Sequence, residues 1–160
     1  MKALIILWSF LCAFQGHAQL ISGKVIRIAD GDSFTLLTVD KKQIRIRLYG
    51  IDCPENGQAF GRVAKDFTGR ILNMGKVEVI QKDIDRYDRV VGIVVVADSI
   101  NLNEMLLKAG LAWHYKYFDK NPIWAAYEQA AIERKEGLWK DTHPIAPWKW
   151  RKGIRAENSE

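Results

Sequence analysis

Residues 44–55 read Ile-Arg-Ile-Arg-Leu-Tyr-Gly-Ile-Asp-Cys-Pro-Glu. An aliphatic side chain stands at every second position from 44 to 48, with arginines between. This period of two predicts a strand that buries one face. The strand is expected to end at Gly50, and the proline-containing loop that follows carries Asp52 and Glu55. A rigid strand therefore places the guanidinium of Arg47 close in sequence to two carboxylates.

These residue types suit chemistry on a phosphate. An arginine can bind a phosphate through two parallel hydrogen bonds. Carboxylates nearby can hold a hard cation or activate water. The same stretch also fits an ordinary amphipathic strand followed by an exposed acidic turn, so residues 44–55 alone leave both interpretations open.

The segment upstream favours the first interpretation. Asp30 and Gly31 lie between two apolar runs, and Asp-Gly in that setting predicts a hairpin turn. The turn does not require an acidic residue at Asp32. If the strands pair, Asp32 comes to lie beside Asp52, and the two carboxylates complete a cation site.

Four motifs in the chain stand in the order that a known family shows. They are Asp30-Gly31-Asp32-Ser33; Arg-Leu-Tyr-Gly-Ile-Asp-Cys-Pro-Glu at 47–55; Asp-Arg-Tyr-Asp-Arg at 85–89; and Asn103-Glu104 followed by Ala-Gly-Leu-Ala at 109–112. Together they resemble the staphylococcal-nuclease-like family, which includes thermonuclease and micrococcal nuclease. The resemblance extends from about residue 21 to residue 139, most of the chain.

Five strands and three α-helices are predicted. Two strands lie between residues 20 and 40, a third precedes Gly50, and two more cover 77–80 and 90–96. Apolar spacing predicts a helix over 60–72, a second over 101–109 ended by Gly110, and a third from Asn121-Pro122 to about Glu136, stopped by Gly137. Periodicity alone indicates a small β-rich barrel or an α+β fold. The resemblance implies the five-stranded OB-fold barrel with three α-helices.

The resemblance also implies a metal site. Asp32 and Asp52 resemble carboxylate ligands of a single Ca²⁺, joined by the backbone carbonyl of Cys53 and by waters. Such all-oxygen ligation is what a hard cation takes. The family's best-known members have threonine where this chain has Cys53, and a carbonyl ligand tolerates either side chain.

Three further residues resemble the catalytic groups of the family. Glu55 corresponds to a glutamate that orients or deprotonates the attacking water, and the sequence leaves both roles open. Arg47 and Arg89 are expected to bind the scissile phosphate from two sides, where their charge matches that of the transition state.

Substrate-binding residues are expected nearby. Arg86 and Tyr87 resemble a Lys-Tyr pair beside the terminal phosphate of the bound nucleotide, with arginine in place of lysine. A base-stacking tyrosine is expected at Tyr115 or Tyr117, with Tyr115 preferred. The resemblance implies cleavage of DNA and RNA with little sequence preference, leaving 3′-phosphates. Single strands are expected to be favoured, because their backbone enters a narrow site without unpairing.

Length, charge and the N-terminus suggest an exported single-domain protein. The 160 residues contain 24 Lys and Arg against 19 Asp and Glu, a basic excess that suits an anionic substrate. Residues 1–18 read as a signal peptide, with an apolar run shorter than the ~20 residues of a membrane span and cleavage before Gln19. We expect a nuclease domain over 19–142 and a tryptophan-rich tail over 143–160. The protein is expected to be a monomer, secreted or periplasmic, without stable membrane association.

Several alternatives remain open at this stage. Trp148 and Trp150 either stack on bases or, as we favour, pack the tail on the domain. Cys53 alone suggests a thiol enzyme, which we disfavour because no histidine with a matching signature accompanies it. His114 is interpreted as a packed or surface residue. The rival functions are a non-catalytic nucleic-acid-binding OB module and an OB-fold adhesin for saccharides or peptides.

Overall fold

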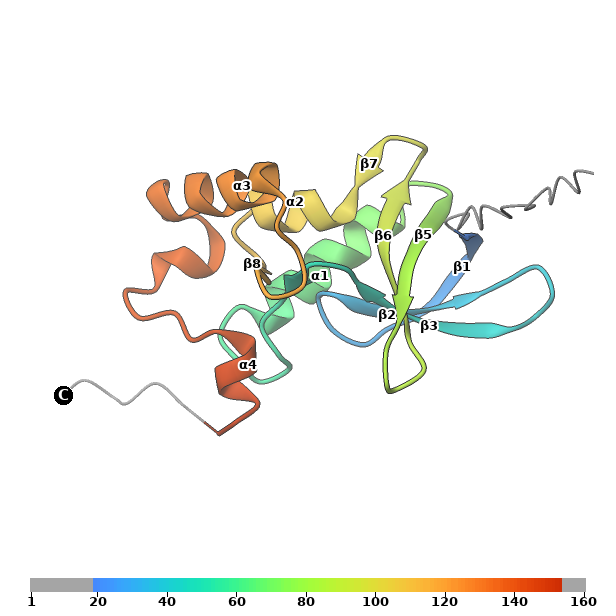
Figure 1. The fold of residues 1–160 in the computed structure, drawn as a ribbon, viewed down its shortest axis with the longest axis horizontal. Helices are drawn as coiled ribbons and strands as arrows, with labels where there is room; N and C mark the ends of the chain where they lie inside the picture. Colours follow the sequence, from blue (N-terminus) through green and yellow to red (C-terminus); the bar gives the residue numbers. More distant parts are fainter. Residues whose placement is uncertain (1–18, 154–160) are drawn as a thin grey trace, which may run out of the picture.

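The computed structural model describes residues 19–153, so the predicted signal peptide and the end of the tail lie outside the described residues. Five main strands form the barrel: β1 (Leu20–Ile28), β2 (Ser33–Leu37), β3 (Gln43–Leu48), β5 (Val77–Ile84) and β6 (Val90–Val96). They pair in the order β3-β2-β1-β5-β6, and a parallel pairing of β3 with β6 closes the sheet. The predicted five-stranded OB-fold barrel with α-helices is confirmed (Figure 1).

The alternation that predicted β3 is the alternation that fills the barrel. Ile46 and Leu48 are buried, together with Leu36 of β2 and Val79 and Val94 of β5 and β6. Arginines occupy the other face of β3. The burial of Ile46 and Leu48 therefore fixes the direction of the Arg47 side chain. A one-residue shift in strand register would point the arginine into the apolar interior.

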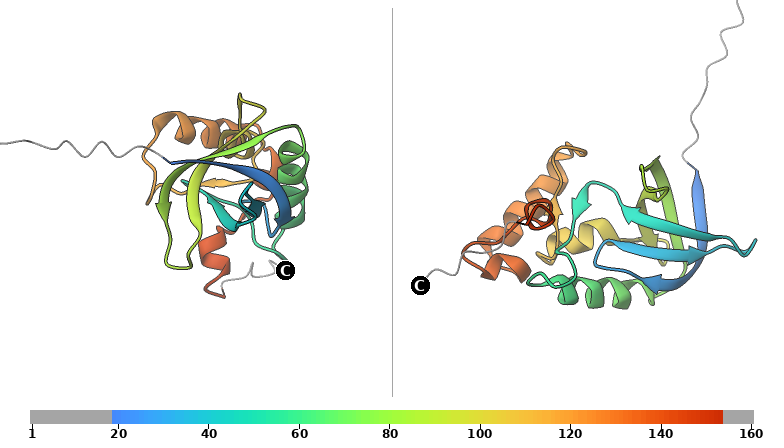
Figure 2. Two further views of the ribbon diagram at one scale, coloured as in Figure 1. Left: turned by 90° about the vertical axis from the view of Figure 1, so that its right-hand side faces the viewer. Right: turned by 90° about the horizontal axis from the view of Figure 1, so that it is seen from below.

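There are three longer helices: α1 (Gly61–Leu72), α2 (Leu102–Lys108) and α3 (Pro122–Glu133). The first two contact barrel strands, and α3 packs on α2. Asn101 and Asn121 cap the second and third, each accepting a backbone N–H through its side-chain oxygen. In Figure 1 and in the right-hand view of Figure 2, the barrel occupies one end of the molecule and α3 lies toward the other.

The third helix ends earlier than the sequence indicated. Glu136 was the expected last residue, but the helix stops at Glu133 because Lys135 adopts a left-handed backbone with φ 52°. Its N–H donates to the carbonyl of Ile132, and the N–H of Glu136 donates to Ala131, which is the Schellman pattern usually made with glycine. Gly110 ends α2 in that pattern, as predicted.

Short elements join these parts: β4 (Ile51–Asp52), β7 (Ile100–Asn101), β8 (Trp113–His114), a 3₁₀ helix η1 (Gly137–Lys140) and α4 (Pro147–Trp150). The last of these was not predicted, and proline at its first position starts it. Within residues 19–153, no helix is long and apolar enough to cross a membrane.

Two buried contacts fix the loops that carry the candidate site. The side chain of Asn103 on α2 accepts the N–H of Val94 and donates to the carbonyl of Tyr49, just after β3. The hairpin turn at Gly31 packs so closely that a Cβ there would lie 2.8 Å from the Cβ of Cys53. Glycine is therefore required at this turn for close approach to the loop after β4, which carries Cys53.

Candidate active site

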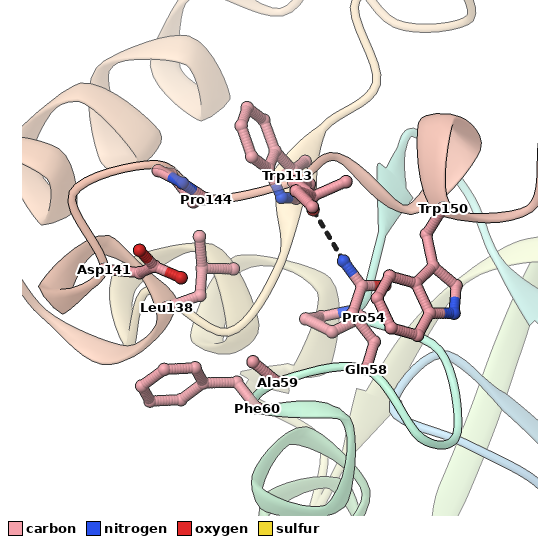
Figure 3. Close-up of a pocket in the computed structure, with 10 residues that line it drawn as sticks. Pro54, Gln58, Ala59, Phe60, Trp113, Leu138, Asp141, Pro144 and Trp150 are labelled. Carbon is pink, nitrogen blue, oxygen red and sulfur yellow. Dashed lines mark hydrogen bonds between the residues drawn. The ribbon is translucent and has the colours of Figure 1, made fainter. Parts of the chain in front are cut away.

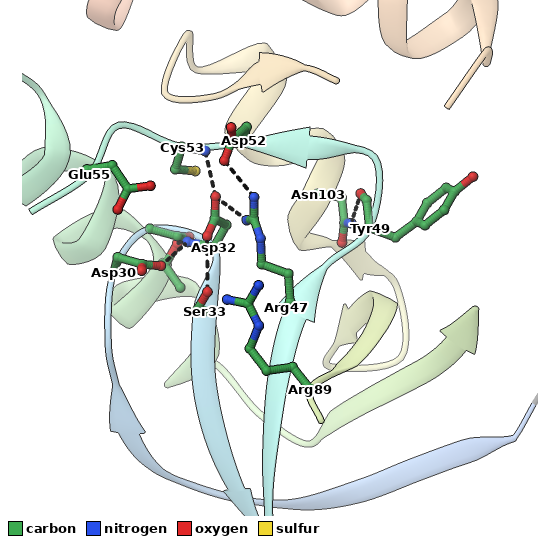
Figure 4. A network of polar contacts seen from close by, with 12 residues as sticks. Asp30, Asp32, Ser33, Arg47, Tyr49, Asp52, Cys53, Glu55, Arg89 and Asn103 are labelled. Carbon is green, nitrogen blue, oxygen red and sulfur yellow. Dashed lines mark hydrogen bonds and ion pairs between the residues drawn. The ribbon is translucent and has the colours of Figure 1, made fainter. Parts of the chain in front are cut away.

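The two predicted metal ligands lie on either side of Arg47. Asp32 ends the β1–β2 turn, and Asp52 belongs to β4; their exposed fractions are 4% and 1%. The Arg47 guanidinium pairs with Asp32 through Nη1 and with Asp52 through Nη2, the latter at 2.6 Å. The backbone N–H of Cys53 donates to Oδ2 of Asp32 at 2.6 Å. Strand pairing thus brings together the residues that the sequence placed at one site (Figure 4).

Burial and charge pull the pKa values of these carboxyl groups in opposite directions. Burial raises the pKa of Asp32, but the charge of Arg47 and hydrogen bonds outweigh it and hold that pKa below 3.8. Burial, with Asp32 nearby, raises the pKa of Asp52 despite Arg47. Burial and the charge of Asp32 raise the pKa of Asp30 to about 7. Burial and repulsion between neighbouring carboxyl groups therefore oppose full ionisation of the cluster, and a bound cation would favour the charged forms.

The donor set fits a hard divalent cation. Within residues 19–153, no three His, Cys, Asp or Glu side chains are grouped to hold a metal. The side-chain ligands on offer are the carboxylates of Asp32 and Asp52, so a backbone carbonyl such as that of Cys53 and waters would have to complete the shell. Oxygen ligands are what Ca²⁺ requires.

The buried thiol of Cys53 is unsuited to nucleophilic attack. Cys53 is 3% exposed. Burial, with the charge of Asp32 beside it, raises the pKa of the thiol well above 9.0. A thiolate is therefore disfavoured at neutral pH, which argues against the thiol-enzyme alternative.

Glu55 lies at the rim of the cluster, on the loop after β4. Its backbone N–H donates to the side chain of Gln58 at 3.0 Å, which fixes the loop. Its carboxylate is partly exposed and accepts Nη1 of Arg151 at 2.5 Å. The same guanidinium binds Asp52, with Nη2 2.9 Å from Oδ2. Sequence reasoning assigned no role to Arg151.

Arg89 follows the turn between β5 and β6. Its Nε and Nη2 both lie 2.7 Å from Oδ2 of Asp85, and its side chain is 29% exposed. In Figure 4 the Arg89 side chain extends toward the side of the cluster that carries Arg47. The parallel β3–β6 register pairs Ile46 with Val90 and so aligns the start of β6, next to Arg89, with β3. Both arginines that the sequence assigned to one phosphate therefore lie on adjacent segments of the barrel.

Residues 45–141 match the model of the family described as staphylococcal nuclease homologue. The chain belongs to the staphylococcal nuclease family. An uncharacterized endonuclease of Escherichia coli is 36% identical over 144 residues, 90% of each chain. A micrococcal nuclease of Shigella flexneri is 37% identical over 143 residues, 83% of this chain and 82% of its own. An uncharacterized endonuclease of Haemophilus influenzae is 37% identical over 129 residues, 81% of this chain and 72% of its own.

The expected substrate-binding residues of this nuclease-family chain are divided between two places. Arg86 and Tyr87 share the turn before Arg89, where Tyr87 is 55% exposed and the Arg86 guanidinium lies 4.8 Å from its ring centroid. Tyr115 lies after β8, stacked on Trp148 with ring centroids 5.0 Å apart. One face of Tyr115 is thus already covered by the tail.

His114 is a packed residue of the nuclease-family fold. It is 3% exposed, and its Nε2 lies 2.7 Å from Oδ2 of Asp119. Its backbone N–H donates to the buried carboxylate of Glu128 at 2.8 Å. These contacts explain the histidine structurally, in agreement with its interpretation from the sequence.

Proposed function

We propose that this chain is a calcium-dependent nuclease that hydrolyses phosphodiester bonds of DNA and RNA with little sequence preference and leaves 3′-phosphate ends. The observation that carries the proposal is the buried Asp32–Arg47–Asp52 cluster with Glu55 at its rim. Membership of the staphylococcal nuclease family and relatives named as nucleases support the same function. Nucleases of this family are generally metal-dependent.

In this proposal Asp32, Asp52 and the carbonyl of Cys53 hold a single Ca²⁺. The bound cation supplies positive charge that offsets the charge developing on the phosphate oxygens. The two carboxylates are buried and held by Arg47 and by the N–H of Cys53. The ligands are therefore positioned before any substrate arrives.

Three of the chain's own residues then act on the water and on the phosphate. Glu55, which is more accessible than Asp32 and Asp52, orients the attacking water or accepts its proton. Arg47 and Arg89 place two guanidinium groups against the phosphate, where hydrogen bonds strengthen as negative charge develops. Neither arginine can lose its proton at physiological pH, so their charge is constant.

Recognition of the backbone and of an exposed base suits a broad substrate range. Arg86 and Tyr87 would contact a neighbouring phosphate, and Tyr115 or the adjacent aromatic residues would stack on a base, which carries little sequence information. Single strands should be cleaved faster than duplexes, and equal rates on both would contradict this part of the proposal. We further propose that the protein acts as an exported monomer, in the periplasm or outside the cell.

The test is cleavage of single-stranded DNA by the mature protein, comparing Glu55→Gln with Glu133→Gln. Both variants lose one carboxylate, but Glu133 ends α3, away from the cluster. Glu55→Gln should lower turnover roughly 10²–10⁴-fold with DNA binding retained. Glu133→Gln should leave turnover unchanged. Turnover of Glu55→Gln within a few-fold of wild type would remove Glu55 from the mechanism. A wild type that binds DNA without cleaving it would establish the non-catalytic OB module instead.

A further inference from the structure

The C-terminal segment returns to the active centre and is fixed there by packing. The side chain of Gln58, on the active-site loop, donates to the carbonyl of Ile145 at 2.6 Å. Trp148 stacks on Tyr115 and meets Trp113 edge-on, with ring centroids 5.6 Å apart. Trp150 lines an apolar pocket together with Pro54 and Gln58 (Figure 3). These contacts set the position of α4 independently of any charge.

This packing places the guanidinium of Arg151, the residue after α4, next to the Asp32–Arg47–Asp52 cluster. Its Nη1 contacts Oδ1 of Asp52 at 3.2 Å and Oε1 of Glu55, while Nη2 contacts Oδ2 of Asp52. Arg151 thereby bridges a proposed cation ligand and the residue proposed to act on water. A guanidinium between these two groups lies where a phosphate must approach to react.

The three arginines of the site differ in how accessible they are. The side chain of Arg47 is 14% exposed and its two Nη atoms are held by buried carboxylates. Arg89 is 29% exposed and is held by Asp85, whereas Arg151 is 43% exposed. Water screens an ion pair more strongly as the exposure of its partners increases, and the side chain of Arg151 is the most exposed of the three. Replacing its carboxylate partners by another anion therefore costs less free energy for Arg151 than for Arg47 or Arg89.

We propose that Arg151 is a third phosphate-binding residue of this enzyme, supplied by the C-terminal segment. The inference rests on the proposed nuclease function. A guanidinium carries five N–H donors in a planar fork, and a phosphodiester accepts two of them in parallel. The ion pairs with Asp52 and Glu55 keep the side chain at the centre until the nucleic acid binds.

The experiment measures binding in a protein whose turnover is strongly reduced. Glu55→Gln protein with saturating Ca²⁺ is titrated into a fluorescently labelled single-stranded oligothymidylate, and anisotropy is followed from 50 to 300 mM salt. The same measurement is made after adding Arg151→Gln or, as the matched control, Lys152→Gln. Both additions remove one positive charge from the same exposed turn, but only Arg151 reaches the cluster. Asp52 remains as its partner in the Glu55→Gln background.

Adding Arg151→Gln should weaken binding about tenfold or more and reduce the slope of log affinity against log salt by about 1. Lys152→Gln should change affinity less than twofold. Near-ultraviolet circular dichroism, which reports the packing of the aromatic side chains and includes the Trp148–Tyr115 stack, should be the same in all variants if the tail stays docked. Arg151→Lys should restore the salt slope but only part of the affinity, because a lysine lacks the fork.

The remaining outcomes overturn the inference in distinct ways. Unchanged affinity and slope would make Arg151 a counter-charge for Asp52 and Glu55 and nothing more. Tighter binding without Arg151 would make it an obstruction that substrate must displace. If the Glu55→Gln parent binds no oligonucleotide, the proposed function fails and the inference fails with it, so the two failures are distinguishable.

Discussion

Replacing Arg47 by glutamine should strongly destabilise the metal-free protein. The substitution leaves Asp32 and Asp52, which are 4% and 1% exposed, without their shared counter-charge. Removing one partner of a buried ion pair costs about 3–5 kcal/mol. Arg151 still contacts Asp52, so we expect the lower end, about 3 kcal/mol. For a domain of this size that corresponds to a fall of roughly 10 °C in Tm.

The pH dependence of this loss identifies its cause. Without Arg47, the pKa of Asp32 rises above 3.8 and the already raised pKa of Asp52 rises further, because burial disfavours their charged forms. The folded state then binds protons more readily than the unfolded chain, so the variant loses stability as pH rises through the raised pKa values. The difference from wild type should therefore be larger at pH 8 than at pH 5.

Urea unfolding with chelator, followed by tryptophan fluorescence at both pH values, measures this difference directly. Arg62→Gln is the control, since its side chain is 93% exposed, and its unfolding midpoint should match that of wild type. Asp52→Asn added to Arg47→Gln should recover part of the lost stability by removing one buried charge. A penalty below about 1 kcal/mol, or one equal at pH 5 and pH 8, would refute the electrostatic reasoning.

Two further substitutions test the residues around the cluster. Cys53→Ser should keep cleavage within about twofold of wild type, because only the backbone of this residue is assigned a role; loss of activity without unfolding would revive the thiol enzyme. Asn103→Ala should lower the free energy of unfolding by about 2–4 kcal/mol, since it leaves the N–H of Val94 and the carbonyl of Tyr49 without their side-chain partner. A chemical denaturation curve that coincides with wild type would show that this asparagine does not hold the loop after β3.

Much of the site could be predicted because it depends on local patterns. The alternation around Arg47 set the face of β3, and the Asp-Gly turn placed Asp32 at the end of the neighbouring strand, so one antiparallel pairing brought the carboxylates together. The parallel β3–β6 pairing, which aligns the start of β6 with β3, joins distant segments and was not predicted. The expectation that Arg89 and Arg47 bind one phosphate came from the family resemblance and not from periodicity.

Arg151 shows where sequence reasoning ends. Its side chain reaches Asp52 across a separation of 99 residues. That contact depends on how Trp148 packs against Tyr115 and how Gln58 holds Ile145. No local signal encodes such tertiary contacts. The early end of α3 at Glu133 was missed for a related reason, because a lysine took the left-handed position that glycine normally marks.

The most direct test of the central claim is cleavage of single-stranded DNA over a Ca²⁺ titration, by the mature wild type and by Asp32→Ala. The account predicts activity that rises with Ca²⁺, disappears with chelator, and is lost in the variant at every Ca²⁺ concentration. A folded Asp32→Ala protein that cleaves DNA with an unchanged Ca²⁺ requirement would contradict the claim that the Asp32–Arg47–Asp52 cluster holds the cation.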